Sequence, residues 1–317
     1  QEARPSRAAA LWMLVLGPFF FLVYGLCNWY TTQRADVGVI VFEWERSIPF
    51  VPWLILPYMT IDAFFAASVF ICRTRQELNP RAYRILAAIV ISAVGFLLFP
   101  MKFTFEHPAV EGFNGVLFDL LLGFDKPYNQ APSLHISLLM ILWVRYAQHM
   151  SAYWRLALHI WFFLIGISVL GVYQHHFIDV IAGFWVGVVC LYLWPEQGWQ
   201  RGSYRADARS LRIGAYYASG AVLALAGAWA WQGWGWLLLW PAAALAMVAS
   251  AYWHVGASVF QKKPDGRMPW PATLLLLPYL LAAQASAWLY LRRLPAFVMV
   301  DSHLAIGSKN APASKHW

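Results

Sequence analysis

Charged residues are scarce in this chain: of its 317 residues only 12% are Asp, Glu, Lys or Arg, whereas 61% are hydrophobic. Soluble domains carry about 25% charged residues, so this shortage argues against an ordinary soluble protein. The charges that are present cluster in short segments between apolar runs. Several of these runs reach the roughly 20 residues that a membrane-spanning helix needs. The composition therefore predicts an integral membrane protein.

Cysteine is also scarce, with three in the whole chain. Cys27, Cys72 and Cys190 each lie within an apolar run and form no CxxC or Cys/His pattern. We interpret them as small hydrophobic residues rather than as disulfide partners or metal ligands. No third carboxylate or cysteine completes a zinc site in the sequence around its histidine motifs. We therefore expect no metal and no cofactor, with a metalloenzyme as the lesser alternative.

Acidic residues are fewer than basic ones, 15 against 23, which gives a formal net charge of +8. Most of the Lys and Arg residues lie in short loops beside apolar runs, for example at 73–84 and 201–212. Such loops set the orientation of a membrane protein, because Lys and Arg remain on the cytoplasmic side. A nucleic-acid partner would need a clustered basic face instead. We expect no nucleic-acid partner, and a cytoplasmic N-terminus.

Apolar runs recur along the chain and predict an all-α, polytopic transmembrane helical bundle. The runs are 8–30, 50–72, 84–104, 134–150, 156–173, 179–195, 213–231, 234–256 and 271–291. The polar loop 201–212 separates six runs that contain every candidate catalytic residue from three that contain none. We predict a six-helix catalytic core in residues 1–200, about three additional transmembrane helices in 201–293, and a polar tail in 294–317 that begins a soluble domain.

The last run presents an inconsistency. Nine crossings would place Arg292 and Arg293 outside the cell, yet an arginine pair is typical of a cytoplasmic flank. Either one of the last three runs does not cross fully, or the C-terminus is external.

The segment 105–133, between the third and fourth runs, is long, and long loops are commonly functional. Its apolar piece, 116–124, is too short to span a bilayer and suits an interfacial or re-entrant helix. Asp125 and Lys126 follow it, and these two side chains could simply pair with each other in a solvated loop.

Pro132-Ser133-Leu134-His135 lies where this loop enters the fourth run. Ser is a favoured helix N-cap, and that role alone would explain Ser133. A helix N-terminus also attracts anions, because its free N–H groups and its dipole both favour a phosphate. A histidine at the entrance of a membrane span is costly to bury, which makes His135 a candidate functional residue.

A second polar cluster, His175-His176-Phe177-Ile178-Asp179, lies at the entrance of the sixth run. His175 and Asp179 are four residues apart, so on a helix they would share one face. An Asp that accepts a hydrogen bond from one imidazole nitrogen leaves the other nitrogen basic, which is how a histidine nucleophile is activated. His176 would point away from this pair, toward substrate or toward the membrane interface.

These two clusters resemble the second and third signature motifs of the type 2 phosphatidic acid phosphatase superfamily. The run Asn129-Gln130-Ala131-Pro132-Ser133-Leu134-His135 is closest in character to the inositol phosphorylceramide synthase-like branch of that superfamily. The resemblance covers residues 80–195. It implies a six-helix core, a phosphohistidine intermediate and no metal. It also implies that His175 is the nucleophile, Asp179 its orienting partner, His135 the general acid and Ser133 a phosphate-binding group.

The chain departs from the superfamily pattern in its phosphate-binding cations. The Lys and Arg-Pro of the first motif correspond at best to Lys102 and His107-Pro108, and the Arg of the third motif is replaced by Val169. Loss of an Arg removes a bidentate phosphate clamp. Lys102, His107, Lys126 or His176 could supply positive charge instead, although Lys102 could equally extend from a span end toward lipid headgroups.

Three functions are consistent with these observations. The first is an integral membrane lipid-phosphate phosphatase that uses water, and the second is a lipid phosphotransferase that moves a phospho-headgroup to an alcohol. The third is a non-catalytic lipid transporter, which would be expected to show broken helices in repeated halves. We expect the phosphatase, in a bacterial inner membrane with its active site on the periplasmic side. The lipid, its headgroup and the oligomeric state are left open by the sequence.

Overall fold

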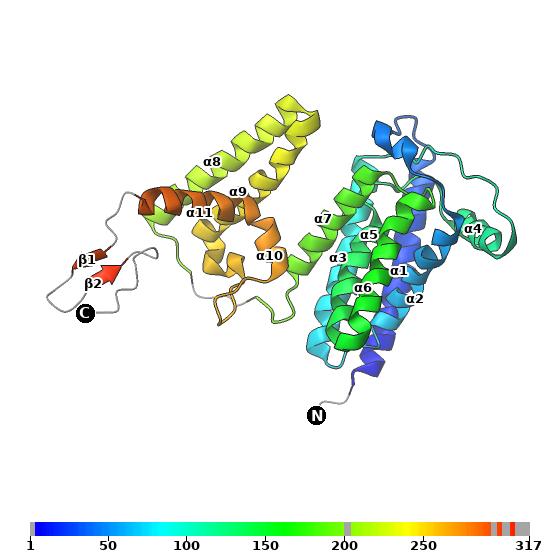
Figure 1. Ribbon diagram of the computed structural model, residues 1–317, viewed down its shortest axis with the longest axis horizontal. Coiled ribbons are helices and arrows are strands. Elements are labelled where there is room, and N and C mark those ends of the chain that lie inside the picture. The colour runs from blue at the N-terminus through cyan, green and yellow to red at the C-terminus, as the bar shows by residue number, and fades with distance from the viewer. Residues whose placement is uncertain (1–3, 200–203, 293–296, 300–304, 308–317) are drawn as a thin grey trace. The chain divides into compact units, whose positions relative to one another are not determined.

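The computed structural model describes residues 4–199, 204–292, 297–299 and 305–307 (Figure 1). The chain divides into two compact units, residues 1–199 and 200–317. Each is described by itself.

The first unit is a bundle of helices, several of which run side by side along its length (Figure 1). Two short 3₁₀ segments, η1 (Glu43–Ser47) and η2 (Pro52–Leu54), follow the first helix. The helices are α1 (Ser6–Thr31), α2 (Ile55–Ser68), α3 (Arg75–Leu98), α4 (Gly112–Phe124), α5 (Leu134–His149), α6 (Ala152–Gly171) and α7 (Phe177–Leu193).

All six apolar runs predicted for the first unit are helical, with shifted ends. The largest shift is in α3, which begins at Arg75 rather than at 84 because Thr74 caps it: the Thr74 side chain accepts a hydrogen bond from the Glu77 N–H. The polar first turns of this helix carry no hydrophobic signal, so the apolar pattern alone could not locate its start. The predicted 116–124 helix is present as α4, whose 13 residues are too few to span a bilayer.

Five helices in the described residues are long and apolar enough to cross a membrane: Ser6–Thr31, Arg75–Leu98, Ala152–Gly171, Ala208–Trp231 and the composite Gly233–Phe260. The chain is therefore an integral membrane protein, as its composition predicts. Several of the other predicted runs form shorter helices, such as the 16-residue α5 and the 17-residue α7.

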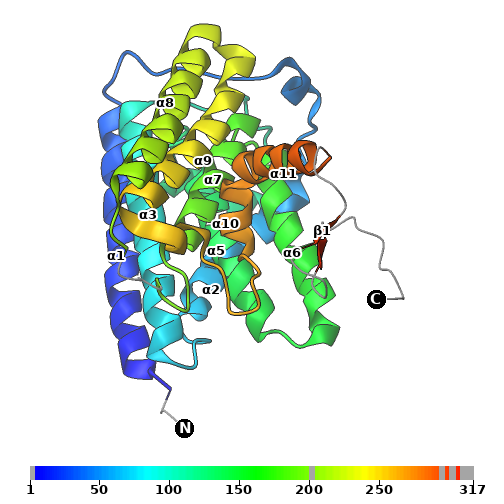
Figure 2. The same ribbon diagram turned by 90° about the vertical axis from the view of Figure 1, so that its left-hand side faces the viewer.

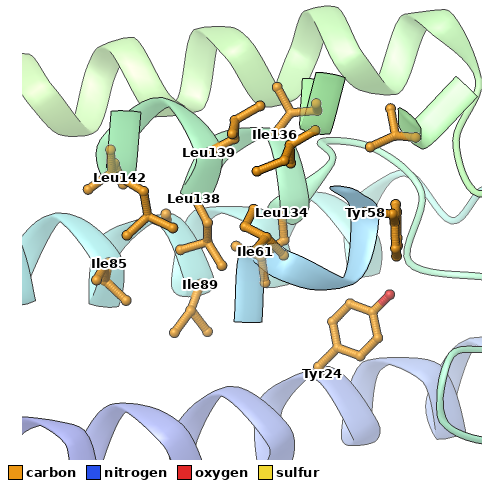
Figure 3. Packing of buried hydrophobic residues seen from close by; sticks show 14 of the residues in the cluster. Tyr24, Tyr58, Ile61, Ile85, Ile89, Leu134, Ile136, Leu138, Leu139 and Leu142 are labelled. Atoms are coloured by element: carbon orange, nitrogen blue, oxygen red, sulfur yellow. The ribbon is translucent and has the colours of Figure 1, made fainter. Parts of the chain in front are cut away.

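The core of the first unit is aliphatic and lies between α2, α3 and α5. Figure 3 shows Ile61, Ile85, Ile89, Leu138 and Leu142 pointing toward one another from these three helices. The same cluster continues to Tyr24 of α1 and Tyr58 of α2, which lie close together at one end of it. Lipid tails are as apolar as these side chains, so the core stabilises the bundle mainly through van der Waals packing, and its interlocking side chains fix how α2, α3 and α5 pack.

Close backbone contact brings α5 and α7 together. A Cβ atom placed on Gly183 would lie 2.4 Å from the Ser133 carbonyl oxygen, and one on Gly187 would lie 2.7 Å from Met140 Cβ. The Ser137 hydroxyl uses this proximity to donate a hydrogen bond to the Gly183 carbonyl oxygen, at 3.0 Å. Small residues at these positions therefore determine the distance between the two helices.

A network of buried arginines lies toward the other end of α5. Arg145 is buried and contacts Glu196 at 3.1 Å and Glu77 at 3.6 Å, and Arg84 lies 3.6 Å from Glu196. These ion pairs join the start of α3, the end of α5 and the segment after α7. They account for arginines that would otherwise be costly to bury in an apolar bundle.

The second unit contains α8 (Ala208–Trp231), η3 (Gly233–Leu238) and α9 (Leu239–Ser250), and α8 and α9 run side by side (Figure 2). The short turns η4 (Ala251–Val255) and η5 (Gly256–Phe260) follow. Asp207 begins α8 by accepting a hydrogen bond from the Ser210 N–H at 2.8 Å. The last predicted run is divided into α10 (Trp270–Leu275) and α11 (Leu277–Leu291), and it is not among the five candidate spans.

The predicted polar tail, 294–317, lies largely outside the described residues. Its described parts form one short antiparallel pair, β1 (Phe297–Met299) with β2 (Ala305–Gly307). Apart from this pair, the regular structure of the described residues is helical.

We predict that Gly183→Ala lowers the stability of the protein, because the new methyl group would overlap a backbone oxygen that cannot rotate away. Overpacking of this kind costs about 1–3 kcal/mol. Thermal unfolding of the detergent-solubilised protein, followed by tryptophan fluorescence, would measure it. Gly25→Ala in α1 is the matched control, since a Cβ there meets nothing within 4 Å. Equal stability of the two variants would contradict the close-packing argument.

Candidate active site

The start of α5 is organised by Ser133. This residue is the helix N-cap, as the sequence predicts: it is fully buried, and its Oγ accepts a hydrogen bond from the Ile136 N–H at 3.3 Å. His135 therefore lies in the first turn of the helix, beside the free N–H groups. Those groups and the helix dipole give this end of α5 a partial positive charge.

The start of α7 differs from the sequence expectation. The helix begins at Phe177, so His175 precedes it, and His175 and Asp179 do not share a helical face. The helix starts there because Asp179 caps it: Asp179 Oδ2 accepts a hydrogen bond from the His176 N–H at 2.8 Å. His175 nevertheless lies near the same carboxylate, since its Nδ1 is 3.6 Å from Asp179 Oδ2. That separation exceeds hydrogen-bond distance.

One hydrogen bond joins the two helix starts directly. The Ser133 N–H donates to the Asp179 carbonyl oxygen at 3.0 Å. The absence of a side chain at Gly183 allows this approach. The two clusters, about 40 residues apart in the sequence, therefore meet at one place, and the dipoles of both helices begin there.

The His135 ring packs face to face on Tyr58, with ring centroids 4.3 Å apart and planes inclined by 21°. Its Nε2 atom is buried and has no hydrogen-bond partner among the described residues, and the same is true of His175 Nδ1. His135 and His175 lie close enough for their charges to interact. The structure thus brings together two histidines that each retain an unpartnered nitrogen. Burying such groups without a partner is costly, and functional sites commonly accept that cost.

Both ring nitrogens of His176 have protein partners. Nδ1 lies 3.1 Å from Glu45 Oε2, and Nε2 lies 3.3 Å from Thr104 Oγ1. The ring is also stacked on Phe103, at 4.4 Å between centroids. This residue therefore ties the loop before α4 to the start of α7, and no ring nitrogen is left for a phosphate in this arrangement.

Glu45 is a site residue that the sequence analysis missed. It is 1% exposed, and besides His176 it accepts hydrogen bonds from the backbone N–H groups of Phe42 and Phe177, both at 2.9 Å. A carboxylate at the N-terminus of α7 is also favoured by the helix dipole. Nothing in the spacing of its segment indicated this role, because its partners His176 and Phe177 lie more than 130 residues away.

The expected phosphate-binding cations lie around the site in two adjoining segments. Lys102 and Lys126 are exposed, and the Phe103 N–H donates to the Pro127 carbonyl oxygen at 2.8 Å, which joins their segments. His107 Nε2 lies 3.1 Å from the Val172 carbonyl oxygen and 3.2 Å from Gln174 Nε2. Burial lowers the pKa of His107, so this histidine is less readily charged than the two lysines.

Asp125 has a partner other than the neighbouring lysine. Its Oδ1 accepts a hydrogen bond from the Tyr24 hydroxyl at 2.6 Å, although Tyr24 is 101 residues away. Asn129 holds the same region by donating from Nδ2 to the Tyr24 carbonyl oxygen, at 2.9 Å. Burial raises the pKa of Asp125 to about 6, and the charge of nearby His175 acts in the opposite direction. The aspartate is thus held by Tyr24 rather than forming a solvated pair with Lys126.

Comparison of the chain with protein-family models, with curated proteins and with solved structures found no match in any of the three.

We predict that Glu45→Ala destabilises the protein markedly. The change leaves three N–H donors without their acceptor, and each buried donor so stranded costs about 1–3 kcal/mol. Thermal unfolding in detergent would measure the loss. Glu43→Ala is the matched control: this nearby glutamate is exposed and its carboxylate pairs with Arg46 at 3.4 Å, and exposed ion pairs contribute little. Equal melting temperatures for the two variants would show that Glu45 does not hold the site together.

Proposed function

We propose that this protein is an integral membrane lipid-phosphate phosphatase that acts through a phosphohistidine intermediate. The observation that carries the proposal is the meeting of His135, whose Nε2 is buried without a partner among the described residues, and His175, whose Nδ1 lies 3.6 Å from Asp179 Oδ2. They meet where two helix N-termini are joined by the bond from Ser133 to Asp179. A two-step phosphoryl transfer requires a nucleophile with its orienting carboxylate, a second acid–base group and an anion-binding helix end.

In the first step His175 attacks the phosphorus of the lipid phosphate. The Asp179 carboxylate lies beside Nδ1, so it favours a proton on that nitrogen and leaves Nε2 as the nucleophile. A P–N bond forms as the ester P–O bond breaks. Burial of His135 Nε2 without a partner disfavours the charged form of the ring, so in this proposal His135 takes up a proton when the negative phosphate is bound beside it. The protonated ring then gives its proton to the departing oxygen, which leaves as an alcohol.

In the second step water replaces the lipid. Neutral His135 takes a proton from the water molecule as its oxygen attacks the phosphorus of the phosphohistidine. The P–N bond breaks, inorganic phosphate is released, and both histidines return to their starting states. One residue thus serves as acid and then as base, which requires its ring nitrogen to be free of a permanent partner.

Stabilisation of the phosphoryl oxygens would come from the α5 N-terminus and from nearby cations. Ser133 is occupied in capping the helix, so in this proposal it acts by presenting the N–H groups rather than by clamping phosphate with its hydroxyl. Lys102 and Lys126 lie on adjoining segments and are the cations best placed to replace the missing arginine clamp. His176 and His107 have protein partners and would hold the surrounding loops.

The resemblance of both motifs to the type 2 phosphatidic acid phosphatase superfamily supports this reaction. Its inositol phosphorylceramide synthase-like branch supports a second candidate, transfer of the phospho-headgroup to an alcohol acceptor. The two candidates share the first step and differ only in the second attacking oxygen. Measuring phosphate release from a lipid phosphate, with and without added alcohol, separates them: release without any alcohol favours hydrolysis.

The distribution of charge supports a site on the periplasmic face of a bacterial inner membrane. His135 and Arg145 lie on the same helix, about 15 Å apart at 1.5 Å per residue. The arginine network therefore lies toward the opposite end of α5 from the histidines, and Lys and Arg are retained on the cytoplasmic side.

We predict that His175→Ala abolishes phosphate release from phosphatidate and prenyl phosphates in detergent, because it removes the proposed nucleophile. His254→Ala is the matched control, since His254 is exposed and lies in the second unit. Normal activity of His175→Ala would refute the phosphohistidine mechanism. Phosphate release by neither the wild-type protein nor the variant, across a broad lipid panel, would refute the phosphatase itself.

We predict that Asp179→Asn lowers kcat by a factor on the order of 10³ or more, as loss of the orienting carboxylate does in other histidine-dependent enzymes. The Asn side chain retains an oxygen that can accept from the His176 N–H, so the melting temperature should change far less than the rate. A rate close to that of the wild-type protein would show that Asp179 serves only as a helix cap.

A further inference from the structure

We infer that Tyr58 is a positioning residue for His135: its ring holds the imidazole by stacking and stabilises the positive charge that the imidazole gains with a proton. The inference rests on the proposed function, because it assigns a task to a neighbour of the proton-transfer group. The observation that carries it is the contact between the two rings, whose centroids are 4.3 Å apart and whose planes are inclined by 21°.

The place of Tyr58 is fixed by the core. This residue lies near the start of α2, and only 5% of it is exposed. It belongs to the buried cluster between α2, α3 and α5, and Figure 3 shows it at one end of that cluster. His135 lies in the first turn of α5. The stack therefore joins the starts of two helices that are packed together, and a ring in such a close-packed setting has little freedom to turn away from the imidazole.

Stacking holds the imidazole through its face and leaves its nitrogens unused. Nε2 of His135 is buried and has no hydrogen-bond partner among the described residues. A hydrogen-bonding partner would favour one protonation state of the ring, whereas a group that acts first as acid and then as base must change its protonation state in each cycle. An aromatic face meets this requirement, because it packs against the imidazole in both states.

The ring of Tyr58 also offsets part of the cost of charging His135, since burial of a group disfavours its charged form. The π face of tyrosine is negative and attracts a cation within about 6 Å of the ring centroid, most strongly where water is excluded. In the second step, the attacking water molecule transfers its proton to His135, so an imidazolium forms as the P–N bond breaks. Tyr58 therefore stabilises this transition state more than the neutral ground state.

The test replaces Tyr58 by phenylalanine and then by phenylalanines that carry successively more ring fluorines, and it measures kcat and KM on phosphatidate in detergent. Fluorine withdraws electrons from the π face and changes the size of the ring little. The logarithm of kcat should fall steadily along the series, by roughly 5- to 30-fold in total, which corresponds to the loss of a cation–π interaction away from water. KM should change little, because Tyr58 acts through His135 rather than on the substrate.

Phe162 is the matched control. It is a fully buried residue of α6 that packs on Phe64 and Tyr146, at 4.8 Å and 5.8 Å between ring centroids, and the same fluorinated residues at this position should leave kcat unchanged. Tyr58→Phe should retain most of the wild-type kcat, because no step uses the Tyr58 hydroxyl. Tyr58→Leu removes the π face and should lower kcat at least as much as the most fluorinated ring.

Nuclear magnetic resonance checks the stack without turnover. Protons over the face of an aromatic ring are shielded by its ring current, so the His135 ring signals of histidine-labelled protein should lie upfield of ordinary positions. Their loss in His135→Gln assigns them. They should remain upfield in Tyr58→Phe and return toward ordinary positions in Tyr58→Leu. Unshifted His135 signals in the wild-type protein would overturn the inference.

The kinetic outcomes separate this inference from the function on which it rests. A kcat that stays constant along the fluorinated series would make Tyr58 a packing residue only, and it would leave the phosphatase intact. Failure of the wild-type protein to release phosphate from any lipid phosphate would refute both proposals, even if the His135 ring signals lie upfield.

Discussion

The hydrogen bond from the Ser133 N–H to the Asp179 carbonyl oxygen is the contact on which the candidate site depends. It joins the first turns of α5 and α7, and with them the two histidine motifs. The bond can form only because Gly183 has no side chain to keep the helices apart. Ser137 adds a second link one turn further on. Two helix N-termini that would repel each other through their dipoles are in this way held together, and the carboxylates of Asp179 and Glu45 already accept hydrogen bonds at the start of α7.

Around this junction, the site residues stabilise different parts of the structure. Asp179 caps α7 and also lies beside His175, so one carboxylate sets both the start of the helix and the charge next to the ring. Glu45 and His176 fix the surrounding loops by satisfying buried donors that have no other partner. A side chain that satisfies several polar groups is favoured in a membrane bundle, because every unsatisfied polar group there costs free energy.

Charge is distributed unevenly along the bundle, and the distribution has a physical reason. Of the buried arginines, Arg145 and Arg84 pair with Glu77 and Glu196, whereas Arg81 has two side-chain nitrogens without a partner among the described residues. At the histidine end, the carboxylates of Asp179 and Glu45 lie beside histidines and backbone N–H groups, and the carboxylate of Asp125 accepts from the Tyr24 hydroxyl. Imidazole can gain or lose a proton near neutral pH, whereas guanidinium cannot. The two ends of the bundle therefore differ in the kind of cation that their carboxylates meet.

The sequence by itself determined the class of the protein and the position of its helices. Long apolar runs can be buried only in lipid or against one another, so the composition predicts a helical membrane bundle. The N-cap at Ser133 is predicted by the preference of Ser for that position. Tertiary structure determined the long-range contacts, which no local sequence pattern predicts. The Ser133 N–H bonds to the Asp179 carbonyl oxygen, and Asp125 bonds to Tyr24 rather than to Lys126. The partners in these pairs are separated by tens to about a hundred residues, and only the packing of α1, α4, α5 and α7 brings them within reach.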